Sequence, residues 1–66
     1  MTKKDYIIIA KCINEAYAEL MDHDEPYDGY YEYAVNRVVS KLINEFPKDN
    51  PAFDRNRFKD AVYKIN

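Results

Sequence analysis

The stretch GYYEYAVNRVVSKLINEF, residues 29 to 46, is the clearest amphipathic segment of this chain. Its apolar side chains recur every three or four residues, which predicts a helix with one buried stripe. The predicted stripe comprises Tyr31, Ala34, Val35, Val38, Leu42 and Phe46. Asp28 precedes the segment as the expected N-cap, and Pro47 follows as its expected end, so we predict a helix over 29–46.

A second helix is predicted before this segment, over 3–21. Thr2 followed by Asp5 fits a capping box with aspartate in place of glutamate. The predicted buried stripe of this helix consists of Ile9, Ile13, Ala16 and Leu20, flanked by Tyr6 and Tyr17. Ile7 and Ile8 fall outside that stripe, so we expect them to be exposed singly or to form a self-association surface.

A third helix is predicted over 55–65, after a stiff connector that contains Pro51. Asp54 is the expected N-cap, and Phe53 and Phe58 have the spacing of a hydrophobic staple. The predicted stripe consists of Phe58, Ala61, Val62 and Ile65. Three amphipathic helices joined by short connections predict an all-α fold, a small three-helix bundle that forms one domain.

Length and composition limit the class of protein. A chain of 66 residues supports one small core, and a core of that size gives marginal stability. Cys12 is the only cysteine, which excludes an internal disulfide and favours a reducing compartment. No run approaches the roughly 20 apolar residues of a membrane span. We therefore expect a soluble protein of the cytoplasm.

Negative charge is concentrated in the middle of the sequence. The net charge is only −2, yet no lysine or arginine stands between Lys11 and Arg37. That interval holds seven acids: Glu15, Glu19, Asp22, Asp24, Glu25, Asp28 and Glu32. A patch of one sign attracts partners of the opposite sign, so this surface is expected to bind a basic partner, unless it is only a solvated loop.

The residues do not predict an enzyme, a metal centre or a cofactor. The candidate nucleophiles are Thr2, Cys12 and Ser40, and the only histidine is His23. The sequence gives no argument that pairs any of them with a base. An exposed acidic loop also gives carboxyl groups little reason to have raised pKa values. DHDEPYDGYYEY, residues 22 to 33, fails the EF-hand pattern, because a proline and tyrosines stand where Asp, Gly and Glu are needed.

The stretch NPAFDRNRF, residues 50 to 58, carries a resemblance to a family. It is similar to small helical proteins of phages and related mobile elements that end in Asn-Pro-x-Phe-Asp-Arg-x-Arg-Phe. The matching positions are Asn50, Pro51, Phe53, Asp54, Arg55, Arg57 and Phe58. The resemblance implies a mobile-element protein in a bacterial host cell. By analogy, such proteins bind and inhibit host factors, including restriction nucleases and CRISPR complexes.

The middle segment supplies the predicted binding surface. Tyr31 belongs to the predicted buried stripe, whereas Tyr27, Tyr30 and Tyr33 should face outward. The acids interleaved with them are Asp24, Glu25, Asp28 and Glu32. Tyrosine is large, rigid and amphipathic, which suits an interface. We therefore expect the partner to be a host or defence protein with a basic groove. The acids would imitate phosphates and the rings would replace stacked bases, or the surface would simply occlude the basic site.

An alternative prediction uses the basic end of the chain. Its cations are Arg55, Arg57, Lys59 and Lys64. They would make the protein a small nucleic-acid-binding regulator, with Ile7 and Ile8 as the candidate dimer contact. A helical wheel places these cations on two flanks of the third helix instead of one stripe, which favours the protein-binding hypothesis.

Overall fold

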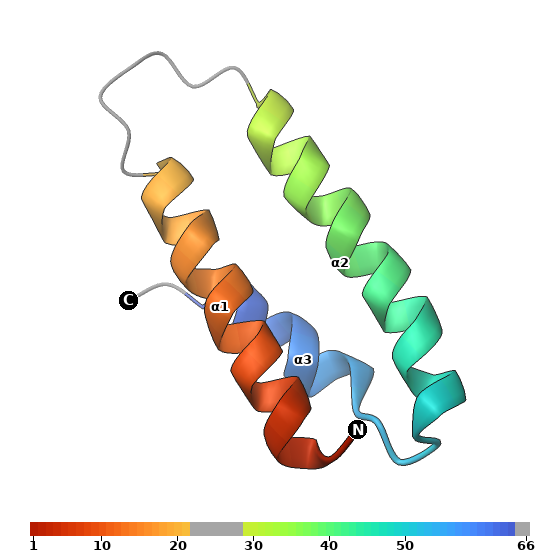
Figure 1. Cartoon of the computed structure of the whole chain (residues 1–66). Helices are drawn as coiled ribbons and strands as arrows, with labels where there is room; N and C mark the ends of the chain where they lie inside the picture. The colour runs from red at the N-terminus through yellow and green to blue at the C-terminus, as the bar shows by residue number, and fades with distance from the viewer. Residues whose placement is uncertain (22–28, 65–66) are drawn as a thin grey trace.

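The computed structural model describes residues 1–21 and 29–64, apart from the side chains of Met21 and Tyr31. It contains three helices, α1 (Lys3–Met21), α2 (Tyr30–Asp49) and α3 (Arg55–Val62), and no strand in the described ranges. Figure 1 shows α1 and α2 running in opposite directions, with α3 returning beside α1. The prediction of an all-α, three-helix fold is confirmed.

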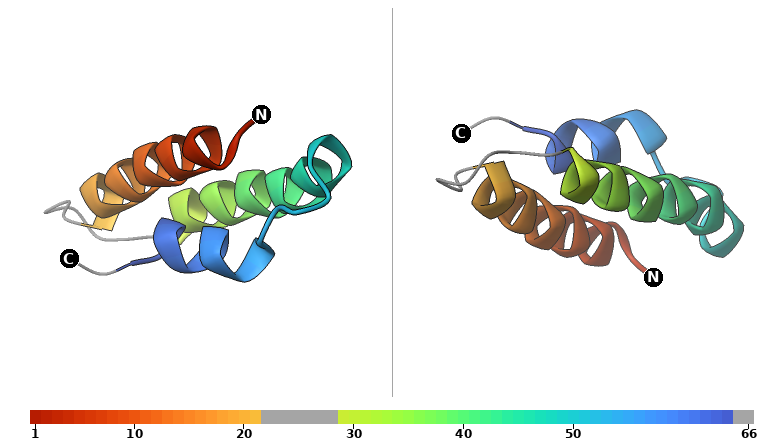
Figure 2. Two further views of the ribbon diagram at one scale, coloured as in Figure 1. Left: turned by 90° about the horizontal axis from the view of Figure 1, so that it is seen from below. Right: turned by 90° about the horizontal axis from the view of Figure 1, so that it is seen from above.

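The short third helix determines how the bundle packs. α3 packs chiefly against α1, and α2 contacts each of the other two helices less extensively. Figure 2 shows that α3 lies alongside only part of α1 and α2. The molecule is consequently elongated, with principal extents of 40 × 20 × 15 Å.

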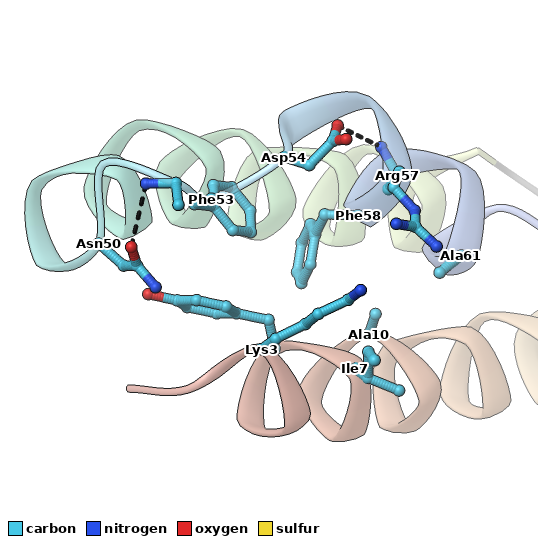
Figure 3. A pocket seen from close by; sticks show the side chains of 11 residues that line it. Lys3, Ile7, Ala10, Asn50, Phe53, Asp54, Arg57, Phe58 and Ala61 are labelled. Atoms are coloured by element: carbon cyan, nitrogen blue, oxygen red, sulfur yellow. Dashed lines mark hydrogen bonds between the residues drawn. The ribbon is translucent and has the colours of Figure 1, made fainter.

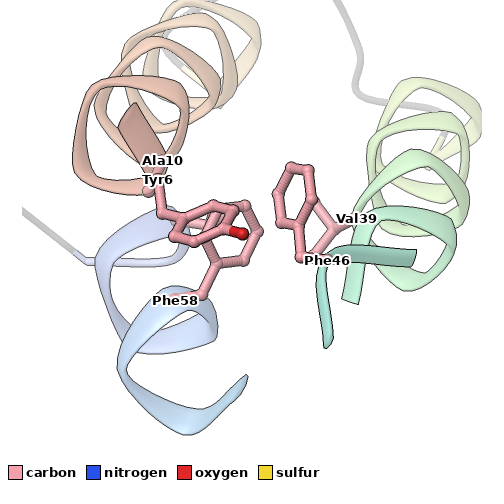
Figure 4. Close-up of a cluster of buried hydrophobic side chains, with 6 residues drawn as sticks. Tyr6, Ala10, Val39, Phe46 and Phe58 are labelled. Carbon is pink, nitrogen blue, oxygen red and sulfur yellow. The ribbon is translucent and has the colours of Figure 1, made fainter. Parts of the chain in front are cut away.

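Aromatic side chains from all three helices meet where the start of α1 lies beside the end of α2 (Figure 4). The Phe46 ring of α2 lies 4.8 Å from Tyr6 and 5.5 Å from Phe58, measured between ring centroids. The other buried apolar residues are Ala10, Val39 and Val62. Tilted and edge-on ring pairs at these distances are favourable beyond the area that they bury.

Two predicted helix starts are confirmed. At α1, the Thr2 backbone amide donates to the Asp5 carboxylate at 2.9 Å, and the Asp5 amide donates to the Thr2 hydroxyl at 3.4 Å. At α3, the Asp54 carboxylate accepts the Arg57 amide at 3.0 Å. The Phe53 ring packs 5.4 Å from Phe58, as the predicted staple requires.

α2 begins one residue after the predicted start, at Tyr30, and extends beyond the predicted end at Phe46. Pro47 lies inside the last turn instead of ending the helix, which continues to Asp49. A proline costs one helical hydrogen bond there, yet the Asn50 amide still bonds to the Phe46 carbonyl at 2.9 Å and closes the final turn. The N-cap position is Gly29, whose φ of 75° suits glycine, while Asp28 lies outside the described residues.

The predicted buried stripes of α1 and α2 are confirmed in part, since Ile9, Ile13, Leu42 and Phe46 belong to the core or pack against it. Each observed stripe also extends to a neighbouring side of its helix. In α2, Val39 is 2% exposed while Val38 is 53% exposed, and Ala34 is also exposed. In α1, Ala10 and Asn14 are buried, whereas Ala16 is exposed. The face that α3 covers, and not apolar periodicity alone, determines which side of α1 is buried.

The end of the third helix was also predicted too late. α3 ends at Val62, and the Tyr63 amide closes its last turn by donating to the Lys59 carbonyl at 3.0 Å. Phe58 and Val62 are buried as predicted, but Ala61 is exposed. Ile65 lies outside the described residues, as does the side chain of Tyr31.

Candidate partner-binding surface

The outward side of α2 carries the most exposed tyrosines that the structure describes. Tyr30 is 75% exposed and Tyr33 is 64% exposed, so the prediction that both face outward is confirmed. Ala34, Arg37 and Val38 follow at helical spacing and are also exposed. We call these five residues the α2 outer face. It lies opposite buried Val39 on the helix and is mostly apolar over its first two turns.

Glu32 does not join the exposed tyrosines. It is half-buried on the side of α2 that faces α1, where its carboxylate accepts the Tyr17 hydroxyl at 3.2 Å. Burial, and then this hydrogen bond, raise the pKa of Tyr17. Glu32 therefore points toward α1 instead of lying between Tyr30 and Tyr33, and its contact with a partner stays a prediction.

The rest of the predicted acidic surface lies in residues 22–28, outside the described part of the chain. It comprises Asp24, Glu25, Tyr27 and Asp28. Among the described residues of the α2 outer face, Arg37 is the only charged one. Of the predicted surface, the structure therefore describes Tyr30 and Tyr33. Tyr27 and the acids of residues 22–28 are known from the sequence alone.

The predicted self-association pair is exposed, in agreement with the sequence. Ile7 is 58% exposed and Ile8 is 49% exposed. Ile7 also lines a cavity beside α3, whereas Ile8 is turned about 100° further around α1. Self-association through this pair stays a prediction.

The four cations of the alternative surface are all exposed, but they are dispersed. Arg57 lines the cavity between α1 and α3, whereas Lys59 lines a shallow cleft between α2 and α3. Arg55 lies one turn before Lys59, and Lys64 follows the end of α3. This arrangement agrees with the predicted division between two flanks of the helix.

The cavity between α1 and α3 was missed by sequence reasoning (Figure 3). It has a volume of about 400 Å³ and an apolar lining that includes Ile7, Ala10 and Phe58. The signal in the sequence was weak, because it consists of small side chains at Ala10 and Ala61. Only the crossing of α1 and α3 shows that these alanines leave a space between them.

A polar cluster ties the start of α1 to the end of α2. The Asp49 carboxylate accepts the Met1 ammonium at 2.9 Å and the Tyr6 hydroxyl at 2.7 Å. These two hydrogen bonds, the ammonium's first, lower the pKa of Asp49. Burial, and then the bond to Asp49, raise the pKa of Tyr6 to about 12. The cluster holds the helices together and leaves Asp49 without the raised pKa that an acid catalyst needs.

The described residues show neither a cluster of metal ligands nor a membrane-spanning helix. Within residues 1–21 and 29–64, no three His, Cys, Asp or Glu side chains gather in a way that would hold a metal ion. His23 lies outside these ranges, so the absence of a metal centre stays a prediction. No helix in the described part of the chain has both the length and the apolar character to cross a bilayer.

No protein-family model, curated protein or solved structure matched this chain. The resemblance of residues 50 to 58 to mobile-element proteins therefore stays a prediction. The structure accounts for much of that motif locally, since the Asn50 carboxamide accepts the Ala52 amide at 3.0 Å and Asp54 caps α3. The exposed side chains of the molecule are therefore the basis for a functional proposal.

Proposed function

We propose that this chain is a non-enzymatic accessory protein that binds and blocks a basic, nucleic-acid-binding surface of another protein. One observation carries the proposal, namely the exposure of Tyr30 and Tyr33 on the α2 outer face beside exposed Val38. A small domain gains nothing in its own stability from large apolar side chains that remain in water. Such residues gathered on one face are typical of a protein interface.

The chemistry of this face suits a site that normally holds nucleic acid. Stacking of a base on an aromatic side chain contributes roughly 1–3 kcal/mol, and a tyrosine ring offers a similar flat π-surface. Tyr30 follows directly after an acidic segment that contains no lysine or arginine. Carboxylates at 22–28 would meet the cations that otherwise contact phosphates, while the rings of α2 occupy the positions of bases.

The sequence also supports a proposal about the kind of genetic element that encodes the protein and the cell in which it acts. The stretch NPAFDRNRF resembles the end of phage and mobile-element proteins, and inhibition of host defence is proposed by analogy with small phage proteins of this kind. We therefore propose an anti-CRISPR-like or anti-restriction-like inhibitor that acts in the cytoplasm of a bacterial host cell. Its partner would be a defence protein with a basic groove.

Affinity capture from a bacterial lysate tests the proposal through two readouts. One is release of the captured protein by DNA, and the other is its loss from a variant without the exposed tyrosines. The immobilised protein should retain a basic, nucleic-acid-binding protein, and double-stranded DNA should release it by competition. The double variant Tyr30→Ala/Tyr33→Ala should lose that protein. Removing two interface aromatics commonly costs 2 kcal/mol or more each, which is roughly a thirtyfold loss of affinity per residue.

Ile8→Ala provides a matched control for this capture. It also removes an exposed apolar side chain, but from a different helix, so it should leave the captured protein and its amount unchanged. Helical circular dichroism should be the same for all three proteins. Capture that survives the double tyrosine variant, or that DNA cannot reverse, would refute the proposal.

A second candidate function follows from one specific observation. Arg55 and Lys59 are both exposed and stand one turn apart on α3, which would allow two neighbouring phosphate contacts. A gel-shift titration of the free protein with DNA at several salt concentrations separates the candidates. We expect no shift. A salt-dependent shift that Arg55→Ala/Lys59→Ala abolishes would favour the nucleic-acid-binding regulator.

A further inference from the structure

The cavity between α1 and α3 exists because small residues stand where the two helices cross. Ala10 and Ala61 lie on its two sides, and neither side chain reaches across the gap. Phe53 and Phe58, whose rings are 5.4 Å apart, form an aromatic wall, and Ile7 lies on the opposite, α1 side. The interior of this space therefore favours an apolar group.

Two cations stand at the cavity, one from each helix. Lys3 belongs to the first turn of α1, and Arg57 to the first turn of α3. Figure 3 shows the Lys3 side chain pointing from α1 toward α3, while the Arg57 side chain points from α3 toward α1. Among the described residues, neither cation forms an ion pair.

The other polar groups of the lining are already engaged. The Asp54 carboxylate, the one acid of the cavity, accepts the Arg57 backbone amide at 3.0 Å as the cap of α3. The Asn50 carboxamide oxygen accepts the Ala52 amide, and the Tyr6 hydroxyl donates to Asp49. Two cations against one carboxylate leave the cavity with an excess of positive charge.

We propose that this cavity binds a small aromatic carboxylate. The aromatic ring would lie between Phe53 and Ile7, and the carboxylate would lie at the mouth, between the Lys3 ammonium and the Arg57 guanidinium. A volume of about 400 Å³ accommodates one ring with a short acidic chain, and it falls in the range of small-molecule sites. The site does not involve the α2 outer face, so the proposal stands independently of the proposed partner.

Titration of the isotopically labelled protein with 3-phenylpropionate tests this site by nuclear magnetic resonance. The backbone amides of Ile7, Ala10 and Ala61 should shift and saturate, with a dissociation constant in the range of about 1 mM that suits a ligand of this size. The neutral 3-phenylpropanamide should bind at least threefold more weakly. The cationic 3-phenylpropylamine should give no saturation.

Charge-removing variants of similar length test the role of the two cations. Lys3→Met and Arg57→Met should each weaken binding of 3-phenylpropionate roughly threefold, as expected for a partly solvated ion pair. Arg55→Met is the matched control, because it removes the same charge from the same turn of α3 without lining the cavity. It should leave the affinity unchanged.

Ala61→Leu tests the location of the site by filling the space, and it should abolish saturation. Ala61 is exposed, so the bundle should tolerate the larger side chain. Equal affinity for the amide and the carboxylate would overturn the proposal. So would unchanged binding in both methionine variants, or shifts that never saturate at Ile7, Ala10 and Ala61.

Discussion

At the scale of single residues, Asn14 shows how one polar side chain fixes the packing of two helices. Its buried carboxamide donates to the carbonyls of Val62 and Lys64, both at 2.8 Å. These carbonyls stand at and beyond the end of α3, where helical partners run out. The bonds tie the middle of α1 to the end of α3, which explains why a polar residue lies in the buried face of α1.

Asn14→Ala should therefore destabilise the protein by about 1–3 kcal/mol, because it leaves buried carbonyls without donors. Chemical denaturation followed by circular dichroism measures this change. Asn44→Ala is the matched control, since Asn44 is exposed on α2 and should change stability by less than about 0.5 kcal/mol. Equal effects of the two substitutions would contradict the buried position of Asn14.

The Tyr6 hydroxyl predicts a pH dependence of stability. Because its pKa is raised from 10.0 to about 12, the folded state keeps the proton at pH values where the unfolded chain has lost it. The contribution is complete below pH 10 and is lost as pH rises toward 12. Asp49 affects stability at acid pH. Its lowered pKa stabilises the folded state above pH 3.8, and this contribution is lost as the pH falls further.

Thermal unfolding across pH compares Tyr6→Phe with the unsubstituted protein. The variant keeps the ring of the core and removes the titrating hydroxyl, so its melting temperature should fall less steeply between pH 10 and 12. Some decline should remain, because the pKa values of Tyr17 and Tyr63 are raised as well. Parallel curves for the two proteins would contradict the role assigned to Tyr6.

At the scale of helices, the sequence predicted the number and type of elements and only part of each buried face. The caps at Thr2 and Asp54 are local interactions, and their residues lie within a few positions of each other, so the sequence reveals them. Which side of α2 is buried depends on α1 and α3, which are distant in sequence. Val38 and Val39 are adjacent and both apolar. The apolar periodicity assigned Val38 to the buried stripe, whereas Val39 is the buried residue.

The candidate surfaces could also be predicted only where they do not depend on contacts between helices. Tyr30 and Tyr33 lie outside any apolar stripe, so their exposure could be predicted from the sequence. The side toward which Glu32 points depends on Tyr17 of α1, a contact that no local pattern reveals. The α1–α3 cavity could not be predicted from the sequence either, because it depends on how these two helices cross.

Substitutions at adjacent valines test the observed rotation of α2. Val39→Ala should cost about 2 kcal/mol, because it removes two buried methyl groups and leaves a space. Val38→Ala makes the same chemical change at an exposed site and should alter stability by less than about 0.5 kcal/mol. Denaturation midpoints give both values. The reverse order would show that the predicted stripe is the buried one.

At the scale of the whole molecule, the bundle separates its core from the surfaces proposed to bind ligands. The aromatic core lies between the three helices, the cavity opens between α1 and α3, and the α2 outer face points away from both. Because Tyr30 is 75% exposed and Tyr33 is 64% exposed, we expect their substitution to leave the bundle folded. Loss of binding in such variants therefore reports on the interface directly.

Hydroxyl-radical footprinting of the captured complex tests the central claim most directly, because mass spectrometry reads each side chain separately. Tyr30 and Tyr33 should be oxidised several-fold less in the complex than in the free protein, since an interface excludes water from its centre. Ile8, on α1, should react equally in both. Oxidation of Tyr30 and Tyr33 that is the same in the complex and in the free protein would contradict the account.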